Sequence, residues 1–129
     1  MSTWEELASY LRAAYRPAED TGDLLKIFCQ HRGGTQLMIV ERASHPHDAL
    51  QAWATILSPV AAAYSVDAES LLKLAARVHV VGGLVRVDDT LYLRHSVPLA
   101  SLSLHDFVAP FQAILIAAAE LQRHCTPDY

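Results

Sequence analysis

The sequence predicts an α+β domain with the order helix, three strands, helix, two strands, helix, whose antiparallel sheet carries helices packed on one face. Two observations lead to this prediction. A long apolar stripe at helical spacing lies near the end of the chain, and short hairpin signals separate runs rich in branched and aromatic residues. At 129 residues the chain suits a single domain, residues 1–129, that can bury a hydrophobic core.

The first helix is predicted over residues 3–15. Ser2 followed by Glu5 resembles a capping box, in which the two residues satisfy free N–H groups at the helix start. Apolar residues then recur at helical spacing until Pro17, which ends the run because it cannot continue a helix.

Two strands are predicted over residues 24–32 and 35–42, which are rich in Ile, Leu, Phe, Met and Val. Gly33-Gly34 between them is the expected two-residue turn, since glycine accepts the positive φ that such turns need. The two strands are therefore expected to form a hairpin.

The next segment is expected to be a polar loop over residues 43–48, followed by a third strand over residues 50–57. Frequent alanine leaves a helix as the alternative for residues 50–57. Ser58-Pro59 is expected to end the strand, which favours a meander, and residues 61–65 are expected to form a link.

Asp67 is expected to cap the second helix, whose apolar face runs to Val78. Strands over residues 80–87 and 91–95 follow. Asp88-Asp89 supplies the turn between them, because Asp tolerates left-handed backbone geometry better than most residues.

The final helix has the strongest signal. Ser103 with Asp106 resembles an N-terminal cap, and Pro110 is expected to kink the helix or to start it anew. The residues that share one helical face are Phe107, Phe111, Ile114, Ala118 and Leu121. The apolar run over residues 113–119 is too short to span a bilayer and is interpreted as part of a core helix.

The apolar surface of this helix is unusually broad, because Ile116 lies away from the main stripe. We therefore expect a second buried contact, across the two-fold axis of a homodimer. The residues predicted to lie at that protein interface are Phe111, Ile114, Leu115 and Ile116.

Composition narrows the classes of partner. Hydrophobic residues make up 52% of the chain and charged residues 19%, which is typical of a folded domain. The net charge of −4, without a Lys/Arg cluster, argues against nucleic acid and against a membrane surface as partners. Glu5 and Glu6 stand where a secretory signal needs positive charge, and Cys29 and Cys125 fit free thiols, so a cytoplasmic location is expected.

The histidines suggest a metal site only at His45-Pro46-His47-Asp48. Two imidazoles and a carboxylate could supply three ligands, but the spacing fits no standard zinc pattern, so a solvated loop is preferred. A small metal- or ligand-binding protein that uses this loop is the alternative function. His31 and His95, in predicted strands, are interpreted as satisfied or solvent-facing.

Other residues able to carry chemistry have simpler structural interpretations. Cys29 is expected to be a packed thiol, Gly82-Gly83 a bend, and Asp88-Asp89 a turn. Trp4, Trp53 and Tyr92 are expected in core or interface packing. No catalytic residue, cofactor or metal ligand is assigned, so the chain is predicted not to be an enzyme. A subunit that completes its catalytic groups with another chain is a further alternative.

The second half of the sequence resembles the YbjN-like family and the wider group that shares the type III secretion chaperone fold. The resemblance covers most of the chain from about Leu24 and lies in Ser58-Pro59-Val60, Leu71-Leu72-Lys73-Leu74, Gly83-Leu84, Asp88-Asp89-Thr90-Leu91-Tyr92-Leu93-Arg94, Val97-Pro98-Leu99 and Leu102. It implies a non-enzymatic homodimer that binds other polypeptides or has a regulatory role. Chaperones of this fold bind an extended client segment along sheet edges and apolar grooves.

Overall fold

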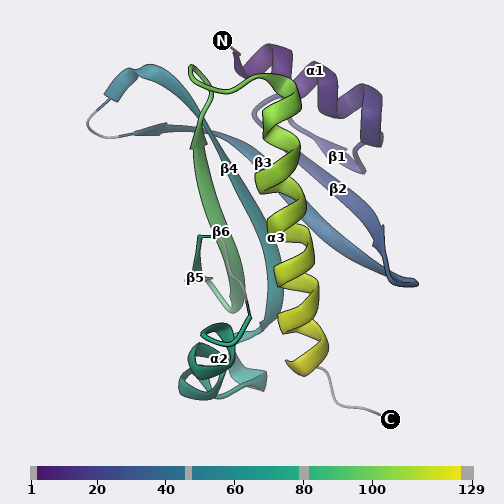
Figure 1. Ribbon diagram of the computed structural model, residues 1–129, viewed down its shortest axis with the longest axis vertical. Helices are drawn as coiled ribbons and strands as arrows, with labels where there is room; N and C mark the ends of the chain where they lie inside the picture. Colours follow the sequence, from purple (N-terminus) through teal and green to yellow (C-terminus); the bar gives the residue numbers. More distant parts are fainter. Residues whose placement is uncertain (1–2, 46–47, 79–81, 126–129) are drawn as a thin grey trace.

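The structure, a computed structural model, describes residues 3–45, 48–78 and 82–125. These residues form an α+β fold with three α-helices on one side of a six-stranded antiparallel sheet, ordered β1-β2-β3-β4-β6-β5 (Figure 1). The helices are α1 (Trp4–Tyr15), α2 (Ala68–Ala75) and α3 (Leu104–Cys125), with a 3-10 turn η1 (Ala63–Ser65). The strands are β1 (Glu19–Asp20), β2 (Leu24–His31), β3 (Gly34–His45), β4 (Asp48–Ala62), β5 (Gly83–Val87) and β6 (Thr90–Pro98). The predicted fold class is confirmed, and β1 is an additional strand.

Helix α1 begins one residue later than predicted. The Thr3 hydroxyl accepts a hydrogen bond from the Glu6 N–H at 3.2 Å, so Thr3, rather than Ser2, is the cap, and Ser2 lies outside the described residues. Arg16 ends the helix with a φ of 51°, and its N–H donates to the Arg12 carbonyl. The sequence allowed both caps, because Ser2–Glu5 and Thr3–Glu6 have the same spacing.

The short strand β1 has no sequence signal of its own, since both of its residues are exposed. Its position follows from tertiary contacts. The Ala18 N–H donates to the Lys26 carbonyl at 2.8 Å, and the Arg12 guanidinium pairs with the Asp20 carboxylate at 2.5 Å. The ion pair therefore ties β1 to α1.

The hairpin between β2 and β3 is confirmed, but its turn is one residue earlier than predicted. Arg32 and Gly33 are the central residues, with φ of 49° and 78°, and His31 pairs with Gly34. Two positive φ values define a type I′ turn, whose twist matches that of the strands. One glycine of the pair therefore serves the turn, and Arg32 accepts the left-handed conformation at the other position.

The loop predicted over residues 43–48 is wrong for most of its length. Strand β3 runs to His45 and β4 begins at Asp48, and these two residues pair across a hairpin end whose residues 46–47 lie outside the described part of the chain. The β3–β4 ladder has a register shift between Ala43 and His45. Residues 50–57 are strand, which excludes the helical alternative.

The predicted end of this strand at Ser58-Pro59 is also wrong, because β4 continues to Ala62 beside β6. Backbone N–H and C=O groups of successive residues point alternately to the two neighbouring strands, and those of Leu37 point towards β4. There Pro59 has no N–H to donate to the Leu37 carbonyl. The Ser58 hydroxyl donates to the Leu37 carbonyl at 2.6 Å instead. The Gln36 side-chain amide donates to the Ser58 Oγ at 2.6 Å and to the Pro59 carbonyl at 3.1 Å. Two buried side chains thus replace the interrupted backbone ladder.

The second half follows the prediction more closely. The Asp67 carboxylate caps α2 by accepting from the Ser70 N–H, although the helix ends before Val78. The turn between β5 and β6 is Asp88-Asp89 as predicted, with an Asp88 φ of 53°. Strand β5 begins at Gly83, and residues 80–81 of the predicted strand lie outside the described residues.

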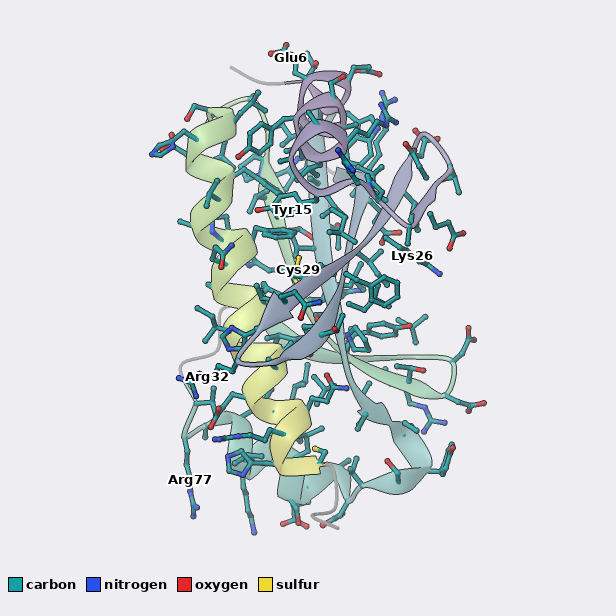
Figure 2. The ribbon with its side chains drawn as sticks, turned by 90° about the vertical axis from the view of Figure 1, so that its right-hand side faces the viewer. Glu6, Tyr15, Lys26, Cys29, Arg32 and Arg77 are labelled. Atoms are coloured by element: carbon teal, nitrogen blue, oxygen red, sulfur yellow. The ribbon has the colours of Figure 1, made fainter. Side chains whose placement is uncertain are left out.

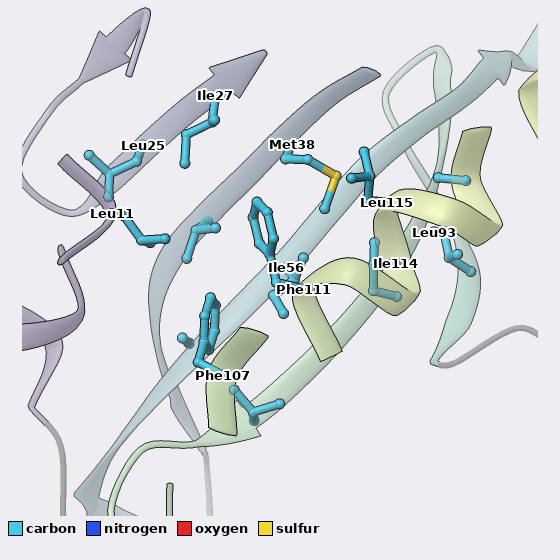
Figure 3. Packing of buried hydrophobic residues seen from close by; sticks show 14 of the residues in the cluster. Leu11, Leu25, Ile27, Met38, Ile56, Leu93, Phe107, Phe111, Ile114 and Leu115 are labelled. Carbon is cyan, nitrogen blue, oxygen red and sulfur yellow. The ribbon is translucent and has the colours of Figure 1, made fainter. Parts of the chain in front are cut away.

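Helix α3 packs along the sheet, and the core lies between them (Figure 3). The predicted stripe is confirmed, since Phe107, Phe111, Ile114, Ala118 and Leu121 are each at most 1% exposed. Ser103 caps the helix by accepting from the Asp106 N–H at 3.1 Å. The helix runs without interruption from Leu104 to Cys125, so Pro110 does not start it anew.

By length and composition, α3 could cross a bilayer, with a mean hydropathy of 1.3 over its most apolar 18-residue window. Its apolar character therefore extends beyond the short run over residues 113–119. The core helix of a folded domain meets the same criteria. Since Phe107, Phe111 and Ile114 face the sheet in Figure 3, α3 serves as the core helix of this domain.

Candidate functional site

The four residues predicted at an interface have different surroundings. Phe111, Ile114 and Leu115 are buried within the chain's own core, whereas Ile116 is 50% exposed. Helix α3 contacts α1 and α2 as well as the sheet, and the Tyr15 and Phe111 rings lie 5.3 Å apart between centroids. Much of the broad apolar surface is thus covered by the chain itself, and Ile116 is the one of the four that a partner can reach.

The residues considered for chemistry are dispersed. Within residues 3–45, 48–78 and 82–125, no three His, Cys, Asp or Glu side chains lie close enough to hold a metal ion. The side chains of the loop His45 to Asp48 lie outside the described part of the structure. Burial raises the pKa of the Cys29 thiol above its ordinary value, which disfavours the nucleophilic thiolate.

Gly82 has a structural explanation. Its φ is +83°, and a Cβ added there would collide with the Arg94 carbonyl and lie 2.9 Å from the His95 Cβ. Glycine is needed because the backbone enters β5 in close contact with β6, in agreement with the predicted bend.

A shallow pocket of about 350 Å³ lies between the β2–β3 turn and the last turns of α3. His31, Arg32, Gln36, Glu120 and Arg123 contribute to its wall. The Glu120 carboxylate accepts from Arg123 at 2.6 Å, and this hydrogen bond is the main cause of its lowered pKa. One of the two arginines is therefore neutralised locally, so the pocket is a weak site for an anion.

A further surface of interest is the face of the sheet opposite α3, here called the open face. Alternation and register place on it Phe28, Leu37, Ile39, Trp53, Leu57, Pro59, Val85 and Tyr92. Figure 2 shows Cys29 between α3 and the sheet, and Lys26, from the alternate set of β2, on the opposite side. No described helix covers the open face.

Exposure varies across the open face. Ile39 and Leu57, at its middle, are 8% exposed, whereas Phe28, on β2, is 59% exposed. An antiparallel sheet with one face in water ordinarily carries polar residues on that face. Here apolar side chains share that face with the polar residues Gln30, Thr35, Thr55 and Ser96, and an exposed apolar patch marks an interaction site in soluble proteins.

Charged side chains also lie on this face, namely Lys26, Glu19, Glu41 and Arg94. Lys26 pairs with Glu19 at 3.1 Å. Glu41 and Arg94 have no ion-pair partner among the described residues. The open face therefore offers one acidic and one basic group that a bound protein could neutralise.

The sequence carries one signal for the open face. Leu37, Met38, Ile39 and Val40 form a continuous apolar run, which is typical of a strand buried on both faces. The run was predicted only as part of a strand. A second apolar face could have been inferred from it, although not which strands adjoin it.

No family model, no curated protein and no solved structure matches this chain. Function is therefore inferred from the fold and from the surfaces described above.

Proposed function

We propose that this protein is a non-enzymatic protein-binding module, chaperone-like or regulatory, that forms a homodimer through the open face and binds an extended protein segment along the adjoining sheet edge. The observation that supports the proposal is the apolar character of a sheet face that no described helix covers, with Phe28 59% exposed. The resemblance to the YbjN-like family and to the type III secretion chaperone fold is a separate prediction of the same kind of function.

The free energy available at this face is substantial. Full burial of one large apolar side chain is worth about 1.5–3 kcal/mol. Phe28 retains most of its surface, and Leu37 pairs beside it on β3 with part of its surface in water. A partner that covers both side chains would therefore gain at most about two such contributions, reduced by the cost of association.

The adjoining edge of the sheet also suits protein binding. Strand β1 pairs with β2 only at Leu25 and Lys26. Beyond them, alternation points the backbone groups of Phe28 and Gln30 outwards, where no described strand meets them. Such an edge can hydrogen-bond an extended segment, which is the mode implied by the resemblance.

Sedimentation equilibrium of the full chain tests the homodimer, and two variants locate it. Phe28→Glu and Ile116→Glu each place a carboxylate at a half-exposed apolar position, so both proteins should fold, as circular dichroism would verify. We expect a wild-type dimer that Phe28→Glu weakens and Ile116→Glu leaves unchanged.

A chain that stays monomeric at every concentration would refute the homodimer. Loss of the dimer in Ile116→Glu alone would assign the interface to α3, as the sequence predicted, and would refute the role of the open face.

A further inference from the structure

The open face carries an apolar diagonal, here defined as Phe28, Leu37, Ile39 and Leu57. Phe28 pairs with Leu37 across β2 and β3, and Ile39 pairs with Leu57 across β3 and β4. Leu37 and Ile39 are two residues apart on β3, so their side chains are neighbours on the same face. The four side chains therefore form a continuous strip that crosses three strands obliquely.

The two unpaired charges lie on opposite sides of this diagonal. Glu41 follows Ile39 by two residues on β3, and Arg94 pairs with Leu57 across β4 and β6. Two strand spacings of about 4.8 Å and one two-residue step of about 6.8 Å separate them by roughly 12 Å. That separation is too long for an ion pair within the chain, which explains why neither has a partner among the described residues.

We propose that the open face binds the open face of a second copy, about a two-fold axis along the apolar diagonal, with Glu41 of each protomer opposite Arg94 of the other. The proposal rests on the homodimer proposed above and specifies its surface. A two-fold contact requires a self-complementary surface. Rotation about the diagonal exchanges its two sides, so an acidic group on one side and a basic group on the other meet twice per dimer.

Other axes are less favourable. An axis parallel to the strands and between β3 and β4 would carry β2 over β6. Lys26 and Arg94 lie in the same row of the sheet, since Lys26 pairs with Ile39, Ile39 with Leu57, and Leu57 with Arg94. Such an axis would place Arg94 over Lys26, whose charge Glu19 already neutralises, and Glu41 over the neutral Thr55, so neither unpaired charge would gain a partner of opposite sign. The diagonal axis gives each of them such a partner.

The size of the face is adequate for a dimer. At a spacing of about 4.8 Å, four strands with about 27 Å of paired length and the shorter β5 with about 17 Å give a face on the order of 600 Å². A standard-size interface buries about 800 Å² per partner. The open face thus approaches that size, and its apolar strip is flanked by charges, as protein interfaces usually are.

Reciprocal charge reversal tests the arrangement. In Glu41→Arg the dimer would place two arginines opposite each other, and in Arg94→Glu two glutamates. We expect each variant alone to weaken dimerisation roughly 100-fold. An equimolar mixture of the two variants should recover a heterodimer, because the arginine introduced at position 41 of one chain would then meet the glutamate introduced at position 94 of the other. The double variant should recover a homodimer for the same reason.

Arg77→Glu is the matched control, since Arg77 is an exposed arginine beyond α2, distant from the open face (Figure 2). It should leave the dissociation constant unchanged. The neutral variants Glu41→Gln and Arg94→Gln remove the ion pair without placing like charges opposite each other. They should therefore weaken the dimer less than the charge reversals do, whereas a defect in folding would not follow this order.

A wild-type dimer that both single reversals leave intact would overturn the inference while the homodimer stands. Weakening without recovery in the mixture would likewise refute the Glu41–Arg94 contact. A wild-type monomer would instead refute the proposed homodimer itself and the inference with it.

Discussion

Replacement of Ser58 by Ala tests whether the Ser58 hydroxyl allows β4 to continue beyond Pro59. Ser58 is fully buried and Gln36 is 3% exposed, so neither can exchange its lost partner for water. The substitution removes the hydroxyl that donates to the Leu37 carbonyl and that accepts from the Gln36 amide, both at 2.6 Å. It changes the side-chain volume very little.

The expected loss follows from the two hydrogen bonds that the substitution removes. A buried polar group that loses its hydrogen bond costs about 1–3 kcal/mol. The Leu37 carbonyl loses the donor that replaced the absent Pro59 N–H, whereas the Gln36 amide keeps its bond to the Pro59 carbonyl. We therefore expect Ser58→Ala to lower the free energy of unfolding by about 2–3 kcal/mol.

Urea denaturation followed by tryptophan fluorescence, at one fixed protein concentration, measures this loss. Ser65→Ala is the matched control, because the Ser65 hydroxyl also donates to a carbonyl, that of Ala62 at 2.8 Å, but is exposed. It should cost less than about 0.5 kcal/mol, since water replaces the lost donor. Equal effects in the two variants would refute the reasoning.

Three other sites give predictions that can be checked one residue at a time. Gly82→Ala should lower the midpoint of urea denaturation more than Gly33→Ala, because both have positive φ but only at Gly82 does the new Cβ meet the backbone of a neighbouring strand. The hydrogen bond from Arg12 lowers the pKa of Asp20. The ionised Asp20 therefore stabilises the fold above its unfolded pKa of about 3.9, and this stabilisation is lost as pH falls through the lower folded pKa. The free energy of unfolding of Asp20→Asn should therefore be lower than that of the wild type at pH 7 and should converge with it in acid. Burial both covers the Cys29 thiol and raises its pKa, so in a Cys125→Ser variant, which lacks the other free and less buried thiol, a thiol reagent should label Cys29 only after denaturation; labelling of that variant in its folded state would contradict the burial of Cys29.

Prediction from the sequence succeeded where the interactions involved are short-range. The caps Asp67 and Ser103 and the turn at Asp88-Asp89 were predicted correctly, because their hydrogen bonds and backbone angles involve residues within three positions. The turn of the first hairpin was displaced by one residue, because either glycine could accept positive φ and only the strand register selects Arg32 and Gly33.

Pro59 shows the limit of a local rule. Proline usually ends a strand because it lacks an N–H. Here the missing donor is replaced by Ser58, with Gln36 contributed by a neighbouring strand. Residues 22 positions apart in the sequence thus determine whether β4 continues.

The candidate site could be predicted only in part. The breadth of the apolar surface on α3 was evident in the sequence, but α1, α2 and the sheet take up most of it within the chain. The apolar composition of β2 and β3 was evident too. Which of their side chains share a face, and that no described helix lies over it, depends on strand order and register.

By itself, the sequence determined the class of the fold, the order of its helices, the caps of α2 and α3 and the stripe that α3 buries, because helical periodicity and capping are local properties. Only the tertiary structure decided that β1 pairs with β2, that β4 passes Pro59, and that Glu41 and Arg94 flank one apolar diagonal. The physical reason is that strand pairing joins residues far apart in the chain, and a shift of one residue would move every side chain to the other face.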